Sequence, residues 1–213
     1  MKKTIFLVLL AVMMLATSFI HFGAITAEAA TDENAIATTQ YTVKNTNKPT
    51  IIVEKGFTLK QQKSHADRAL KTMNMLPSAI LKKLKNVKIY IVKDANDYYS
   101  KSEKVRAFYM PGSKKIYISS ANLINKFVLL HELGHAFDYI SGNKSQTSEF
   151  KKIYNAEKSS SSFQKTNLRE YFADAFANYT LGLTNSSFAK LFDKIPKTKA
   201  YIKKVTGMGD LKK

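Results

Sequence analysis

Hydrophobic and polar residues follow two different patterns along the chain, and the patterns divide it into two parts. Short β-branched or apolar runs predict strands at residues 50–53, 87–92, 106–110 and 115–119, the last two joined as a hairpin by a turn at Pro111-Gly112-Ser113. Apolar residues at helical spacing predict helices at residues 58–73, 78–84, 121–140, 148–157, 168–181, 187–192 and 197–205, with Ser120 as the cap of the third. Strands mixed with helices come first and helices alone follow. This order predicts an α+β fold with a small α/β lobe at about residues 50–120 and a helical lobe at about residues 121–213.

The first residues are typical of a targeting segment rather than a folded element. Lys2 and Lys3 precede an apolar run, and Ala27-Glu-Ala-Ala30 ends it, which is typical of a secretory signal peptide. We expect residues 1–29 to be removed, with cleavage after Ala29 or one residue later; an uncleaved N-terminal anchor is the alternative. Residues 30–49 are polar and lack apolar periodicity, so they are expected to form a flexible leader before a catalytic domain at 50–213.

The composition of the chain excludes several kinds of protein and of site. The chain has no cysteine, which excludes a disulfide scaffold, a thiolate metal site and a thiol nucleophile. The 34 Lys and Arg against 16 Asp and Glu give a net charge of +18, which favours contact with an anionic cell wall. No motif for specific nucleic-acid recognition is present. We therefore expect a monomeric protein secreted by a Gram-positive bacterium, without membrane contact once the signal is cleaved.

One short motif carries the chemistry. Residues 131–135 read His-Glu-Leu-Gly-His within a predicted apolar helix, so His131 and His135 lie on one helical face and can bind one zinc ion. Glu132 lies beside them, where its carboxylate can reach a water molecule at the ion. In a chain with only 4 histidines, this pattern arises by accident on the order of 0.001 times. A catalytic zinc site needs a third protein ligand and one open position.

The third ligand is sought among the remaining residues. A metzincin would have glycine and histidine where this chain has Asp138 and Ser141, which excludes that class. His65 lies far upstream on a polar helix and is expected to be solvated. Asp138, one turn beyond His135, fits a hydrogen-bonding group near the site and a plain surface acid equally well.

A later acidic pair is the best candidate. Glu170 and Asp174 fall one turn apart on a predicted helix whose other residues are largely apolar. Buried carboxylates are costly unless they are paired or bind a metal, so Glu170 is predicted to be the third zinc ligand. Asp174 is expected to accept a hydrogen bond from the free N–H of one histidine, with His131 as the first choice.

These two motifs resemble those of the anthrax toxin lethal factor-like metallopeptidase family, which includes the small secreted Pro-Pro endopeptidases. The resembling segments are His131-Glu-Leu-Gly-His-Ala-Phe-Asp138 and Glu170-Tyr-Phe-Ala-Asp-Ala-Phe176. The resemblance implies a zincin-like fold, with the active-site cleft between the two lobes. It also implies zinc held by His131, His135 and Glu170, and Glu132 as the general base.

One position departs from the family pattern. Well-studied members carry a tyrosine, thought to stabilise the oxyanion, where this chain has Phe163. Tyr154, Tyr171 and Tyr109 are possible replacements that the sequence cannot rank.

The sequence thus predicts a secreted zinc endopeptidase that hydrolyses extracellular or cell-surface proteins. An extended peptide is expected to pair with the edge strand at 106–110. Two alternatives stay open: a zinc-binding but catalytically weak homologue, and a cationic wall-binding protein with a structural metal.

Overall fold

A computed structural model describes residues 33–100 and 104–212. Within these ranges the strands are β1 (Tyr41–Val43), β2 (Thr50–Val53), β3 (Lys88–Val92), β4 (Ala107–Met110) and β5 (Lys115–Ser119). The α-helices are α2 (Leu59–Met73), α3 (Ser78–Lys83), α4 (Lys126–Ile140), α5 (Ser148–Glu157), α6 (Leu168–Gly182), α7 (Ser186–Lys190) and α8 (Pro196–Thr206), and the short 3₁₀ helices are η2 (Ala95–Tyr98), η3 (Ser120–Ile124) and η4 (Lys144–Gln146). The α+β order predicted from the sequence is confirmed.

The strands of the described chain form one mixed sheet in the order β1-β2-β3-β5-β4. The three central strands are parallel, while β1 and β4 run antiparallel to their neighbours and form the two edges. Inward-facing residues such as Ile51, Ile89 and Ile116 are fully buried against the helices. The outward face carries an aromatic stack in which Tyr117 lies between Tyr90 and Phe108 in the strand register.

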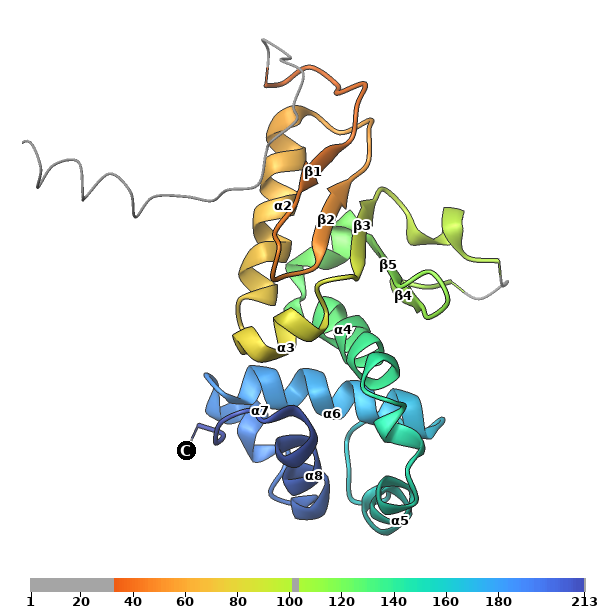
Figure 1. Ribbon diagram of the computed structural model, residues 1–213, viewed down its shortest axis with the longest axis vertical. Helices are drawn as coiled ribbons and strands as arrows, with labels where there is room; N and C mark the ends of the chain where they lie inside the picture. The colour runs from red at the N-terminus through yellow and green to blue at the C-terminus, as the bar shows by residue number, and fades with distance from the viewer. Residues whose placement is uncertain (1–32, 101–103, 213) are drawn as a thin grey trace, which may run out of the picture.

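Helix α4 connects the sheet to the helical part of the molecule, because it contacts β4 and β5 as well as α6. In Figure 1, α2 lies along the sheet, α4 runs below it, and α6 crosses under α4, with α7 beside one end of α6 and α5 and α8 lower down. The contact between α4 and α6 is close because Gly134 has no side chain: a Cβ there would lie 3.1 Å from the Cα of Ala173. Phe137 and Phe176 stack across the same contact at 5.4 Å between ring centroids.

Two sequence expectations about these elements need correction. Residues 30–49 were expected to be a flexible leader, yet Tyr41–Val43 forms β1, which pairs with β2. The helix predicted at 121–140 divides into η3 and α4, because the Asn125 side chain accepts a hydrogen bond from the N–H of Phe127 and caps α4 in place of Ser120.

The predicted signal peptide, residues 1–29, lies outside the described residues. Among the helices in the described part of the chain, none is both long and apolar enough to cross a membrane.

Candidate metal centre

The two histidines of the motif lie side by side on α4. The Nε2 atoms of His131 and His135 are 3.0 Å apart, and their rings are nearly perpendicular. Both positions come from the i, i+4 spacing of the helix, which places the two side chains over one turn. His131 is 8% exposed, so its ring has little access to water.

The carboxylate of Glu170 faces the histidine pair from α6. Its Oε2 lies 3.1 Å from Nε2 of His131, and its Oε1 lies 3.4 Å from Nε2 of His135. Glu170 is in the first turn of α6, where the Asn167 side chain caps the helix by accepting from the Glu170 N–H. The sequence-predicted ligands His131, His135 and Glu170 are therefore brought together.

This geometry fits a zinc ion. Ligand atoms about 2.0–2.1 Å from a tetrahedral zinc lie about 3.3 Å from one another, close to the spacing of these three side chains. The donor atoms of His131, His135 and Glu170 all lie within 4.8 Å of one another, and together they can hold a metal ion. Two imidazole nitrogens that face each other are stabilised by a cation between them.

Asp174 holds the ring of His131 on the opposite side. Its Oδ1 lies 2.8 Å from Nδ1 of His131, and the side chain is 5% exposed. Its Oδ2 accepts a hydrogen bond of 2.7 Å from the backbone N–H of Gln164. The contact with His131, expected from the sequence, is present, and it leaves Nε2 of that ring pointing at His135 and Glu170.

Burial and neighbouring charges perturb the acid–base groups. Burial by itself lowers the pKa of His131, but hydrogen bonds with Asp174 and Glu170 raise it to about 10. Hydrogen bonds with His131 and His135 hold the pKa of Glu170 well below its usual range. Burial raises the pKa of Glu132, while the charges of His131 and His135 oppose the rise. A raised pKa suits a carboxylate that exchanges protons near neutral pH.

Glu132 lies beside the ligands and next to the edge of the sheet. It is 7% exposed, and the backbone amide of Tyr109 on β4 hydrogen-bonds to its carboxylate. This contact could not be predicted from the sequence, because it joins the edge strand β4 to helix α4, and the two meet only in the folded chain.

A cavity of about 1100 Å³ opens over the centre. Its walls include β4, one side of α4 and the segment from Gln164 to Glu170; it contains His131, Glu132, His135 and Glu170. Tyr109 and Gln164 also line the cavity, although they lie far apart in the sequence. The groups that can hold a metal therefore line one cavity together with Glu132.

Two other residues considered from the sequence have different surroundings. Asp138 is 3% exposed and accepts hydrogen bonds from the N–H and the hydroxyl of Ser145, so it is not a surface acid. His65 was expected to be solvated, but it is half-buried and packs edge-on against Phe57.

The position expected to carry a tyrosine lies in the core. Phe163 is 4% exposed, and its ring packs against Tyr171 and Phe192. Of the three possible replacements, Tyr109 alone lines the cavity, while Tyr154 and Tyr171 do not.

Comparison with known proteins places this arrangement in context. The family model described as "Anthrax toxin lethal factor, N- and C-terminal domain" matches residues 93–205, which include both motifs. Among solved structures, the Pro-Pro endopeptidase PPEP-2 from Paenibacillus alvei is similar, with a TM-score of 0.56 and 21% sequence identity over 73% of this chain and 96% of that chain. No curated protein matches the chain. The likeness to PPEP-2 confirms the predicted zincin-like fold.

Proposed function

Because this chain belongs to the anthrax toxin lethal factor family, we propose that it is a secreted, zinc-dependent endopeptidase that cleaves extracellular or cell-surface proteins. Family membership supports a metallo-endopeptidase. The observation that carries the proposal is the convergence of His131, His135 and Glu170 in one cavity, with Glu132 beside them.

The protein groups have separate roles in this proposal. His131, His135 and Glu170 hold the zinc ion, and Asp174 fixes the orientation of His131 through Nδ1. Bound zinc would polarise the scissile carbonyl and acidify the attacking water. The Glu132 carboxylate takes the proton from that water and gives it to the leaving amine as the carbon–nitrogen bond breaks.

The edge strand offers a binding site for the substrate backbone. β4 pairs only with β5 within the described sheet, so the backbone groups on its other side are available to an extended peptide, apart from the N–H of Tyr109, which donates to Glu132. The strand lines the cavity, and the backbone amide of Tyr109 lies at Glu132. A peptide that adds to β4 by main-chain hydrogen bonds would pass over the metal centre.

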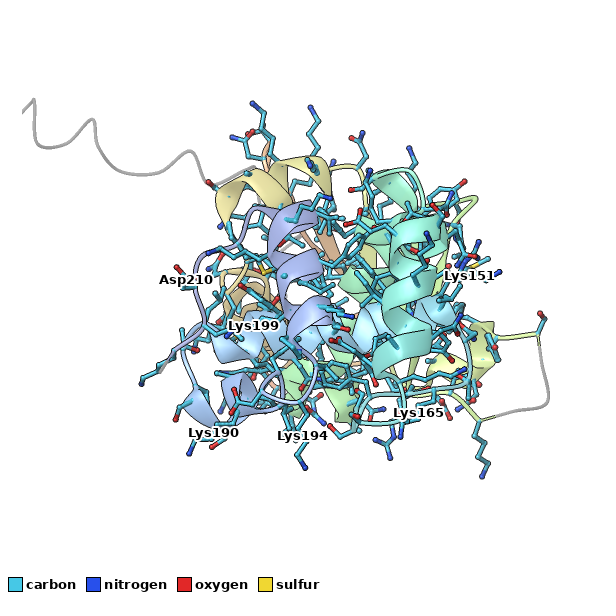
Figure 2. The ribbon with its side chains drawn as sticks, turned by 90° about the horizontal axis from the view of Figure 1, so that it is seen from below. Lys151, Lys165, Lys190, Lys194, Lys199 and Asp210 are labelled. Atoms are coloured by element: carbon cyan, nitrogen blue, oxygen red, sulfur yellow. The ribbon has the colours of Figure 1, made fainter. Side chains whose placement is uncertain are left out.

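Charge and the N-terminal sequence support a site of action outside the cell. Residues 1–29 have the features of a cleaved signal peptide, and a net charge of +18 favours contact with an anionic wall. Figure 2 shows Lys151, Lys165, Lys190 and Lys194 projecting from the helical end of the molecule, and all four are exposed.

The proposal is tested by digestion of a peptide library with the purified mature protein, with and without a chelator. We expect cleavage that the chelator abolishes and that added zinc restores. Glu132→Gln should retain zinc and lose about 10²–10⁴-fold in rate. Cleavage at the parent rate by this variant would overturn the role of Glu132.

Zinc content tests the ligand set separately. The protein should bind one zinc ion, and Glu170→Ala should lose it, whereas Glu149→Ala on the surface of α5 should not. Full zinc occupancy in Glu170→Ala would overturn the assignment. Zinc binding without cleavage of any library peptide would favour the two alternatives, a catalytically weak homologue or a wall-binding protein with a structural metal.

A further inference from the structure

The proposed endopeptidase must stabilise the negative charge that develops on the scissile carbonyl oxygen, and the side chain at position 163 cannot do so. Phe163 has no hydroxyl, and its ring lies in the core between Tyr171 and Phe192, with centroid distances of 5.7 and 5.5 Å. A donor has to come from another residue in the cavity wall.

The three tyrosines considered from the sequence do not supply it. The hydroxyl of Tyr154 donates to the backbone carbonyl of Lys165 at 2.6 Å. The hydroxyl of Tyr171 lies 3.1 Å from Oγ1 of Thr198, on the side away from the cavity. Tyr109 lines the cavity, but its hydroxyl oxygen is buried within the protein and cannot face a substrate in this conformation.

Gln164 lies beside this site. It is exposed and is one of the residues that line the cavity with Glu132, His131 and Glu170. Its backbone N–H donates to Oδ2 of Asp174, whose other oxygen contacts His131. Gln164 is therefore fixed to the metal centre through one carboxylate.

We propose that the side-chain amide of Gln164, the residue after Phe163, donates the hydrogen bond that stabilises the oxyanion. This inference rests on the proposed endopeptidase function. The amide N–H donates without transferring its proton: the proton of the attacking water goes to Glu132 and then to the leaving amine. A neutral carboxamide is a competent donor for this purpose, and loss of one such donor reduces kcat by about 10²–10³-fold.

Three other polar side chains of the cavity wall are less suited. The Gln146 amide donates to Oγ of Ser145 at 3.0 Å, and the Asn167 side chain caps α6. Arg169 is an exposed cation of the same wall and is one competitor. Its charge would bind an anionic group of the substrate before the reaction as well as during it, which would change KM together with kcat.

The test compares Gln164→Ala and Gln164→Glu with the zinc-loaded parent protein on one cleaved peptide. Both changes keep the backbone N–H that binds Asp174, so zinc content should be unchanged. We expect kcat to fall about 10²–10³-fold, with KM within about threefold. Glu149→Ala, on the exposed surface of α5 and outside the cavity, is the control and should keep the parent kcat.

A second measurement does not depend on turnover. A peptide phosphinate, which imitates the tetrahedral oxyanion, should bind Gln164→Ala more weakly than the parent by about the same factor, measured by calorimetry. Parent-like kcat and phosphinate affinity in both Gln164 variants would overturn the inference and leave the proposed function standing, and a loss confined to Arg169→Ala or Tyr109→Phe would reassign the donor. A parent protein that neither cleaves a peptide nor binds the phosphinate would overturn both.

Discussion

Asp174 contacts His131 and Gln164 at once: Oδ1 lies 2.8 Å from Nδ1 of the imidazole, and Oδ2 accepts the backbone N–H of Gln164 at 2.7 Å. One buried carboxylate thus links the ring that is proposed to hold zinc to the loop that forms a wall of the cavity. This link joins α4, α6 and the segment before α6 into one unit.

We predict that Asp174→Ala lowers zinc affinity about 10–100-fold, because His131 loses the acceptor that orients it. Asp174→Asn should lose less, since the amide oxygen can still accept from Nδ1. The measurement is a competition titration of zinc against a chelating dye. Equal affinity in the parent and Asp174→Ala would show that the contact does not orient the ligand.

Zinc binding should release about one proton per ion at pH 7. The pKa of His131 is raised to about 10, so the metal-free ring is protonated at neutral pH and the proton must leave before Nε2 can bind zinc. Affinity should therefore rise with pH up to about 10 and fall as the pH is lowered. The stability of the metal-free protein should depend on pH in the opposite direction. The raised pKa of His131 stabilises the fold at a pH below the unfolded-state pKa of about 6.5, and this contribution disappears as the pH rises through about 10.

The released proton is measured by calorimetry in buffers of different ionisation enthalpy. His65→Ala serves as the control, because His65 lies on α2 against Phe57, and it should release the same number. Zinc binding without proton release at pH 7 would contradict the raised pKa of His131.

Phe163→Tyr should not improve the enzyme. The ring is 4% exposed and packed between aromatic neighbours, so a hydroxyl added there is buried rather than placed in the cavity. A buried hydroxyl without a partner costs about 1–3 kcal/mol, which should lower the melting temperature. Thermal unfolding and kcat are measured together; a rise in kcat of tenfold or more would mean that this side chain reaches the substrate.

Gly134→Ala should destabilise the protein, although alanine favours a helix more than glycine does. The added Cβ would lie 3.1 Å from the Cα of Ala173 and 3.2 Å from its carbonyl oxygen, both in the backbone of α6. Overpacking of this kind costs about 1–3 kcal/mol and would move Glu170 away from the histidines. Gly112→Ala, where a Cβ meets nothing within 4 Å, is the control for thermal unfolding and zinc affinity.

The sequence predicted those parts of the fold in which local pattern and tertiary packing agree. The long apolar runs that form α4 and α6 were placed within a few residues, because burial follows their helical spacing. β1 was missed because Tyr41–Val43 is short and stands in a polar segment; its pairing with β2 makes it a strand. Asn125 lies within the helix expected at residues 121–140, but it caps the start of α4.

The same division applies to the candidate site. The spacing of His131 and His135 fixes their common face, and the burial expected around Glu170 and Asp174 pointed to a role for both. The hydrogen bond from Gln164 to Asp174 and the amide of Tyr109 at Glu132 depend on how separate segments meet. No local pattern contains that information.

The edge of β4 also carries a risk of self-association, because unpaired backbone groups on an edge strand can pair with another chain. β4 is only four residues long, from Ala107 to Met110, and it ends at the turn that begins with Pro111. An exposed cation, Arg106, precedes it. A short edge strand flanked by a proline and an exposed cation offers few backbone groups to a second copy of the chain, and this limits self-association.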